Sequence, residues 1–228
     1  MATLLERLKF LRYRLFYGAL LHRNYNLVEY GNRAVWCSWF LCPDGLNAGS
    51  IVYAGGVGRD ISFEHTLKQK FGCSIVLFDP SPTGKATMAL PENQIPQFKF
   101  HPVALAAQCG TLTFAPPPDQ AEGSWFADTT GGATLEVPCV DLPTLMRQNG
   151  HTRIDLIKID IEGAEYGVLD QIVKLKLPIR QILVEFHHTI LPGVSRGQTI
   201  RALLKLAAAG YHLLKQDGSN HTFLHPRH

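Results

Sequence analysis

The chain is poor in cysteine, and its cysteines are not spaced as metal ligands. Its 228 residues include five, with no C-x-x-C pair among them: Cys37, Cys42, Cys73, Cys109 and Cys139. An odd number without such spacing predicts neither a disulfide framework nor a zinc site. Reduced thiols in a cytoplasmic protein are the simplest interpretation.

Charge is also sparse, since charged residues make up 18% of the chain and the formal net charge is +3. A general nucleic-acid-binding protein needs a dense basic face, so we expect no nucleic-acid partner. Low-complexity tracts and repeats of solenoid period are absent, which excludes a repeat array. With 46% hydrophobic residues, the chain is suited to one large domain with a substantial core.

The first residues, MATLLERLKFLRYRLFYGALLH, lack the uninterrupted apolar run of a membrane span or signal peptide. One helical face nevertheless carries four leucines, Leu4, Leu8, Leu11 and Leu15. We predict that residues 1–48 form an N-terminal helical or extended segment and that its helix docks on the following domain. Its basic residues, Arg7, Lys9, Arg12 and Arg14, leave open a membrane-surface helix or a partner-binding arm.

From residue 49 to residue 228, apolar strands alternate with amphipathic helices. The predicted strands are 51–54, 74–78, 98–103, 111–114, 154–161, 181–186, 211–216 and 221–224. The predicted helices are 61–71, 83–90, 142–148, 164–176 and 199–209. This alternation predicts an α/β fold. We expect a three-layer Rossmann-like sandwich with a mostly parallel sheet, an antiparallel edge strand from the closing pair, and a Pro-rich insertion after residue 114.

A glycine-rich turn follows the first strand of this domain. Gly55, Gly56 and Gly58 let the backbone bend sharply and let a ligand approach closely. A dinucleotide fingerprint would require G-x-G-x-x-G, and the last position counted from Gly56 is Ile61. The missing glycine argues against a nicotinamide-dependent oxidoreductase. Asp60 caps the next helix or contacts a ligand, and the sequence favours neither interpretation.

Asp79 ends the second strand, about twenty residues beyond the glycine turn. A carboxylate in this place can bind both hydroxyls of a ribose. Alone, it is equally well explained as a turn cap. Together, the turn and the aspartate indicate a ribose-bearing cofactor that needs no phosphate cradle. S-adenosylmethionine meets this description.

A second chemical signal lies where the apolar run from Ile154 ends. Asp160 follows the strand directly, and Glu162 comes two residues later, so both are predicted to face the ligand cleft. His187, after the next strand, is a further candidate base because imidazole titrates near neutral pH. Asp160 and Glu185 on adjacent strands could bind a divalent cation, although no cluster of fixed spacing supports a metal site. Lys158, inside the apolar strand, is expected to pair with a carboxylate.

Several of these segments resemble the FkbM-type family of S-adenosylmethionine-dependent methyltransferases. The most specific is IDLIKIDIEGAEYGVLD at 154–170, and GGVGRDISFE, IVLFDPSP, FHPVAL and ILVEFHH support it. The resemblance covers residue 51 to the C-terminus. It implies a methyltransferase sandwich that binds S-adenosylmethionine through Gly55, Gly56, Gly58, Asp60, Asp79, Pro80 and Ala104, with Asp160, Glu162 and His187 as catalytic residues. It also implies a hydroxyl acceptor on a sugar, a glycan or a natural product.

Two positions depart from the family pattern. Ala54 stands where many members have an acidic residue, and Arg59 stands where the branch in question is often acidic. A positive charge pointing at a sulfonium would weaken cofactor binding. A non-catalytic family member and a Rossmann-type oxidoreductase therefore remain as alternatives, because fold alone does not define function. The sequence does not specify the acceptor or the oligomeric state.

Overall fold

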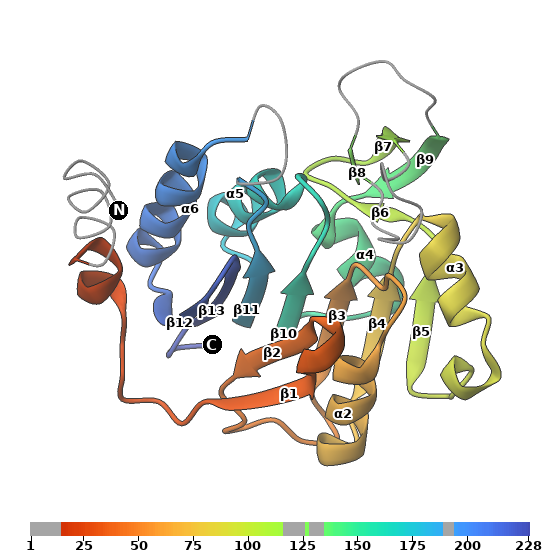
Figure 1. Cartoon of the computed structure of the whole chain (residues 1–228), viewed down its shortest axis with the longest axis horizontal. Helices are drawn as coiled ribbons and strands as arrows, with labels where there is room; N and C mark the ends of the chain where they lie inside the picture. Colours follow the sequence, from red (N-terminus) through yellow and green to blue (C-terminus); the bar gives the residue numbers. More distant parts are fainter. Residues whose placement is uncertain (1–14, 116–125, 128–134, 189–193) are drawn as a thin grey trace, which may run out of the picture.

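The computed structural model describes residues 15–115, 126–127, 135–188 and 194–228. Its main sheet has seven strands in the order β12-β13-β11-β10-β3-β4-β5 (Figure 1). Their bounds are β3 Ile51–Gly55, β4 Ser74–Phe78, β5 Phe98–His101, β10 Ile154–Ile159, β11 Ile179–Glu185, β12 His212–Asp217 and β13 Asn220–Leu224. The strands β3, β4, β5, β10 and β11 are parallel, and β13 pairs antiparallel with β11. The predicted mostly parallel sheet with an antiparallel strand from the closing hairpin is confirmed.

Apolar residues on both faces of this sheet produce three layers. The helices are α2 Ser62–Phe71, α3 Pro82–Met88, α4 Leu142–Asn149, α5 Glu165–Leu175 and α6 Arg196–Ala208. One core contains buried residues of α4, α5 and α6 packed on the sheet, and the other contains residues of α2 and of a hairpin near the N-terminus. Strands covered on both faces read as continuous apolar runs, which is why the sequence revealed them.

The register of the parallel strands brings their carboxyl ends to one edge. Ile159 is paired with Gly55 on one side and with Val184 on the other, so the residues that follow these strands are neighbours. Asp160 follows β10, and Glu185 is the last residue of β11. Ligands of open α/β sheets bind at this edge.

A second sheet of four strands, in the order β6-β9-β7-β8, lies beside this edge (Figure 1). Its strands are β6 Ala104–Leu105, β7 Gly110–Ala115, β8 Phe126–Ala127 and β9 Leu135–Val140. Strand 111–114 was predicted and is found in β7. Strand β9 was not predicted, because Pro138 within it argues against a strand. The three successive prolines at 116–118 lie outside the described residues.

The N-terminal segment contributes a hairpin and a docked helical turn. Strands β1 Val28–Asn32 and β2 Cys37–Leu41 are antiparallel and joined by η1 Arg33–Val35. Residues 15–20 are helical, and the buried Tyr17 places its hydroxyl 2.9 Å from His221 Nε2. Leu15, the one described member of the leucine stripe, is 65% exposed, and the docking contacts come from Tyr17 together with Phe16, Leu20 and Leu21.

A membrane-surface role for this segment stays a prediction, because Leu4, Leu8 and Leu11 lie outside the described residues. Within the part of the chain that the structure describes, no helix has the length and apolar character needed to cross a membrane.

Candidate active site

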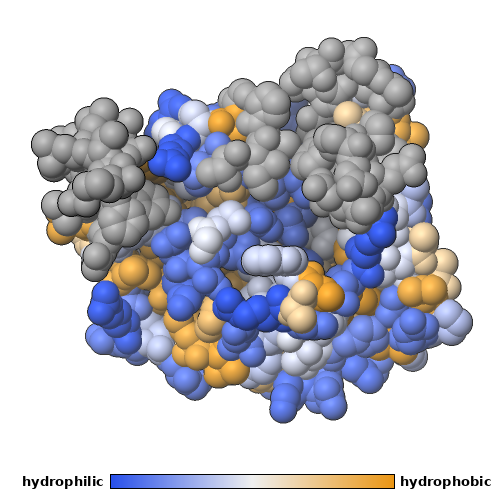
Figure 2. Space-filling view, in the orientation of Figure 1, coloured by the Kyte–Doolittle hydropathy of each residue, from blue (hydrophilic) through white to orange (hydrophobic). Residues whose placement is uncertain are grey.

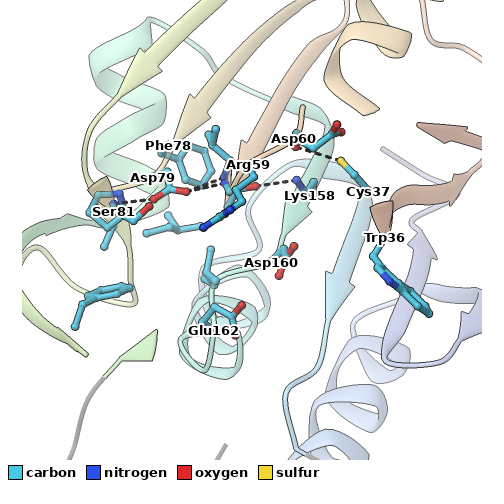
Figure 3. A pocket seen from close by; sticks show the side chains of 18 of the residues that line it. Trp36, Cys37, Arg59, Asp60, Phe78, Asp79, Ser81, Lys158, Asp160 and Glu162 are labelled. Carbon is cyan, nitrogen blue, oxygen red and sulfur yellow. Dashed lines mark hydrogen bonds between the residues drawn. The ribbon is translucent and has the colours of Figure 1, made fainter. Parts of the chain in front are cut away.

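A cavity of about 470 Å³ opens at the carboxyl edge of the main sheet (Figure 3). This volume falls in the usual range for small-molecule sites, about 300–1,000 Å³. Eight of the ten predicted site residues line it: Gly56, Gly58, Asp60, Asp79, Pro80, Ala104, Asp160 and Glu162. Gly55 and His187 are not among the lining residues. The fold therefore brings the glycine turn and the acidic strand end to one cavity.

The glycine turn is held in place by Asp79. Oδ2 of Asp79 accepts hydrogen bonds from the backbone N–H groups of Val57 and Gly58, at 2.9 and 3.0 Å. Its Oδ1 accepts a third from Ser81 N at 2.8 Å. Two oxygens offer about four acceptor sites, so capacity remains for a ligand hydroxyl. Asp79 is thus a turn-holding residue at the pocket wall, and its contact to a ribose stays a prediction.

The three glycines of this turn differ in the space around the position that a Cβ atom would occupy. Gly56 has φ +82°, and a Cβ there would collide with the backbone carbonyl of Asp160. Gly58 has φ +56°, and no atom lies within 4 Å of where its Cβ would be. Gly55 ends β3, where a Cβ would press on the Phe78 ring. Gly56 and Gly55 therefore allow close packing, whereas Gly58 keeps the pocket side of the turn open.

A buried ion pair supports the pocket from below. Lys158 donates to Glu64 Oε1 at 3.1 Å and to the Gly56 carbonyl at 2.8 Å, and the two side chains are 3% and 0% exposed. Burial opposes the charge of Lys158, but the adjacent Glu64 carboxylate outweighs it and raises the pKa of the lysine. The expected pairing of Lys158 is confirmed. The sequence did not reveal Glu64 as the partner, because a glutamate in the first turn of a predicted helix is an ordinary residue at that position.

Asp60 has a structural role and also lines the pocket. Its Oδ1 accepts a hydrogen bond from Ser62 N at 2.8 Å, at the start of α2. Burial alone would raise its pKa, but the hydrogen bonds from Ser62 bring the pKa below its usual range. Arg59 lines the same cavity. The residue that departs from the family pattern therefore lies at the cavity wall.

Asp160 and Glu162 form the acidic side of the cavity. Burial and the nearby charge of Glu185 raise the pKa of Asp160 above its ordinary value. Glu162 has φ +49°, a left-handed conformation that is uncommon outside glycine. Such conformations persist where the surrounding structure imposes them and cluster at functional sites. Glu162 thus combines this conformation with a place in the wall of the cavity.

His187 lies behind these carboxylates and contacts both of them. Its Nε2 is 3.7 Å from Asp160 Oδ1 and 3.2 Å from Glu162 Oε2. Its Nδ1 lies 3.3 Å from Oε1 of the fully buried Glu165. The other oxygen of that carboxylate, Oε2, accepts a hydrogen bond from Gly163 N at 2.7 Å. Burial lowers the pKa of His187, but the hydrogen bond with Glu165 and the neighbouring carboxylates raise it to about 9. The imidazole is thus oriented by one carboxylate and faces two others.

Trp36 and Cys37 are among the cavity residues that were not singled out from the sequence. Trp36, at the tip of the β1–β2 hairpin, is 89% exposed, has φ +59° and lines the cavity mouth (Figure 3). Cys37 also lines the cavity, and burial raises its pKa to about 11, so it is a thiol at neutral pH. A lone tryptophan in a segment without periodicity gives no sequence signal of a site.

Figure 2 shows one face of the molecule, coloured by hydropathy. In the view of Figure 2, hydrophobic and hydrophilic residues are interspersed over the described part of the surface.

Fold and site together define a class. A Rossmann-like sheet with an antiparallel strand beside β11 carries a glycine turn without a dinucleotide fingerprint and an acidic cleft, which is the arrangement of a methyltransferase sandwich. The family model of the methyltransferase FkbM domain matches residues 41–213. The chain belongs to this family of S-adenosylmethionine-dependent methyltransferases, as the sequence motifs indicated.

Solved structures show weaker likenesses. Monomeric WbdD is 15% identical, with a TM-score of 0.44, over 76% of this chain and 35% of that chain. StiE O-MT is 9% identical, with a TM-score of 0.38, over 73% and 46% of the two chains. Fibrillarin of Methanococcus jannaschii, a pre-rRNA processing protein, is 11% identical, with a TM-score of 0.42, over 88% and 81%. The chain thus spans less than half of the first two. No curated protein sequence matched this chain.

Proposed function

We propose that this protein transfers a methyl group from S-adenosylmethionine to a hydroxyl group of a sugar, a glycan or a natural product. The observation that carries the proposal is the division of one cavity into two chemically different sides. The glycine turn and Asp79 form one side, and the carboxylates of Asp160 and Glu162 form the other. Methyl transfer needs a bound methyl donor and a nucleophile held in line with it, so positioning supplies much of the rate.

The residues on the first side suit the cofactor. Asp79 has acceptor capacity left for ribose hydroxyls, and Pro80 and Ala104 offer apolar surface beside it. The open space at Gly58 leaves room for the amino-acid moiety. When bound, S-adenosylmethionine supplies an electrophilic methyl group on a sulfonium ion.

The residues on the second side suit a hydroxyl acceptor. Asp160 and Glu162 can hold the hydroxyl by hydrogen bonds, and the proton released as its oxygen gains the methyl group can pass to Glu162. His187 contacts both carboxylates and holds them in position. Negative side chains also favour the cationic donor over its neutral demethylated product.

Calorimetric titration with S-adenosylhomocysteine and with NAD⁺ tests the cofactor assignment. We expect binding of S-adenosylhomocysteine and none of NAD⁺. Binding of NAD⁺ instead would favour an oxidoreductase. If S-adenosylhomocysteine binds but labelled methyl groups reach no member of a panel of hydroxylated sugars, glycans and phenols, the non-catalytic alternative gains support.

Asp79→Ala should weaken the binding of S-adenosylhomocysteine by about 1–3 kcal/mol, the usual cost of losing hydrogen bonds to a charged group. The variant removes the ribose acceptor and also releases the N–H groups of Val57 and Gly58. Asp170→Ala, an exposed substitution on α5, is the matched control. Equal affinity of wild type and Asp79→Ala in the same titration would show that the ribose binds elsewhere.

Trp36 is proposed to contact the acceptor, because an exposed indole at the cavity mouth offers a flat surface to an incoming ring. Aromatic contacts contribute about 0.5–1.5 kcal/mol beyond buried area, so Trp36→Ala should raise the acceptor KM about 2- to 10-fold. Trp36→Phe should retain most of the affinity, and binding of S-adenosylhomocysteine should not change. A loss of cofactor binding with an unchanged acceptor KM would assign Trp36 to the cofactor side.

A further inference from the structure

We propose that Asp160, Glu185 and His187 bind a divalent first-row metal ion of the Mn²⁺ type beside the cofactor cavity. Each residue offers one ligand atom, and these atoms lie within 4.8 Å of one another. They come from the ends of the adjacent parallel strands β10 and β11, whose pairing is fixed by the register of Ile159 and Val184. Glu185 is the last residue of β11, and Asp160 and His187 follow β10 and β11 within two residues, so the strand pairing brings all three together.

The spacing suits coordination with small adjustments of the side chains. In an octahedral site with metal–ligand bonds of about 2.1 Å, neighbouring ligand atoms are about 3 Å apart and opposite ones about 4 Å. His187 Nε2 and Asp160 Oδ1 are 3.7 Å apart, and the three ligand atoms lie within 4.8 Å of one another, so binding an ion would draw them closer together. Carboxylate oxygens suit Mn²⁺ and Mg²⁺, and imidazole suits later first-row ions. A mixed set of two carboxylates and one imidazole favours an ion that accepts both.

Two of the three ligands, His187 and Glu185, are held in orientation by hydrogen bonds to residues outside the ligand set. Histidine ligands commonly donate their other ring N–H to a carboxylate, which points the free nitrogen at the metal. His187 does this with the fully buried Glu165, at 3.3 Å from Nδ1, so Nε2 is directed at the cluster. The Ser219 hydroxyl donates to Glu185 Oε1 at 2.7 Å and restrains that side chain. These contacts make the arrangement more than a group of acidic residues on a surface.

The charge balance also favours a cation. Four carboxylates gather around one imidazole, those of Asp160, Glu162, Glu165 and Glu185. Lys158, whose charge also acts on Asp160, is paired with the buried Glu64. Carboxylates brought together at short distance repel one another unless a cation or protons offset their charge. A divalent ion that takes the place of the His187 proton would offset more of this negative charge and fix the positions of its ligands.

A metal ion at this place would extend the proposed function, and only this step depends on that function. Three protein ligands leave coordination positions open for water or for an acceptor oxygen. A bound cation lowers the pKa of a hydroxyl that coordinates it. Since Asp160 both lines the cavity and belongs to the ligand set, the ion would lie where the acceptor hydroxyl is proposed to bind, and Glu162 would remain to take its proton.

Titration of the purified, chelator-treated protein with Mn²⁺, followed by EPR, tests the site directly. We expect one bound ion per chain, with nitrogen modulation from His187 in the pulsed spectrum. Glu185→Gln should weaken Mn²⁺ binding at least tenfold and leave the binding of S-adenosylhomocysteine unchanged. Asp170→Asn, which removes an exposed carboxylate on α5, should bind Mn²⁺ like wild type.

The outcomes separate this inference from the proposed function. If wild type binds no Mn²⁺, or if Glu185→Gln and Asp170→Asn bind it equally, the metal site is refuted. Methyl transfer that persists in EDTA would leave the proposed function standing and show that the catalytic step needs no metal. Failure to bind S-adenosylhomocysteine would refute the proposed function but would not alter the Mn²⁺ result.

Discussion

Asp160→Asn is expected to lower the rate of methyl transfer by about 10²- to 10⁴-fold, the range for loss of a group that assists proton transfer. Asparagine has nearly the same shape but no negative charge, so it holds a hydroxyl poorly and cannot favour loss of its proton. The backbone N–H of Asp160 bonds to the Gly55 carbonyl at 3.2 Å, and this contact survives the substitution. The fold should therefore persist.

The measurement compares initial rates of transfer from labelled S-adenosylmethionine with the affinity for S-adenosylhomocysteine. A large fall in rate with little change in affinity supports a role at the acceptor side. Asp170→Asn, on the solvent-exposed surface of α5, controls for loss of a charge in general. Full activity in Asp160→Asn would mean that the reaction takes place elsewhere in the cavity.

Breaking the buried pair of Lys158 and Glu64 is expected to have the largest effect on stability. Removing one partner of a buried ion pair typically costs about 3–5 kcal/mol, because the other charge is left buried and uncompensated. Lys158→Met and Glu64→Leu should each lower the free energy of unfolding by such an amount, measured by urea denaturation. Oε2 of Glu64 has no hydrogen-bond partner among the described residues, so the lysine is its main compensation.

The double variant distinguishes stability from function. Replacing a buried pair by apolar residues of similar size is often neutral or stabilising. The combined variant should therefore recover most of the lost stability. It should still bind S-adenosylhomocysteine more weakly, because Lys158 also holds the Gly56 carbonyl of the glycine turn. Additive losses of stability in the double variant would show that the two side chains act independently.

Much of the fold was predictable because its signals are local. Strands such as β4 and β10 are covered on both faces and appear as short apolar runs, and glycine marks the turn between β3 and α2. Parallel pairing of the strands, each followed by a helix, then places their carboxyl ends at one edge of the sheet. This placement is why the sequence predicts Asp79, Asp160 and Glu162 at the site.

Other features depended on residues far apart in the chain. Strand β9 was missed because Pro138 interrupts its pattern, and its partner β7 supplies the pairing that makes it a strand. The hairpin that carries Trp36 reaches the cavity mouth only through packing of β1 and β2 against α2 and the sheet. Neither feature leaves a periodic signal.

The sequence by itself determined the α/β class, the glycine turn and the strand-end carboxylates, since each follows from a local pattern of side chains. Tertiary structure alone decided that Glu64 neutralises Lys158, that Glu165 orients His187, and that His187 joins Asp160 and Glu185 in one cluster. The physical reason is that ion pairs and metal ligands depend on distances in space. Those distances are set by strand register and helix packing, to which each of these residues contributes only a small part.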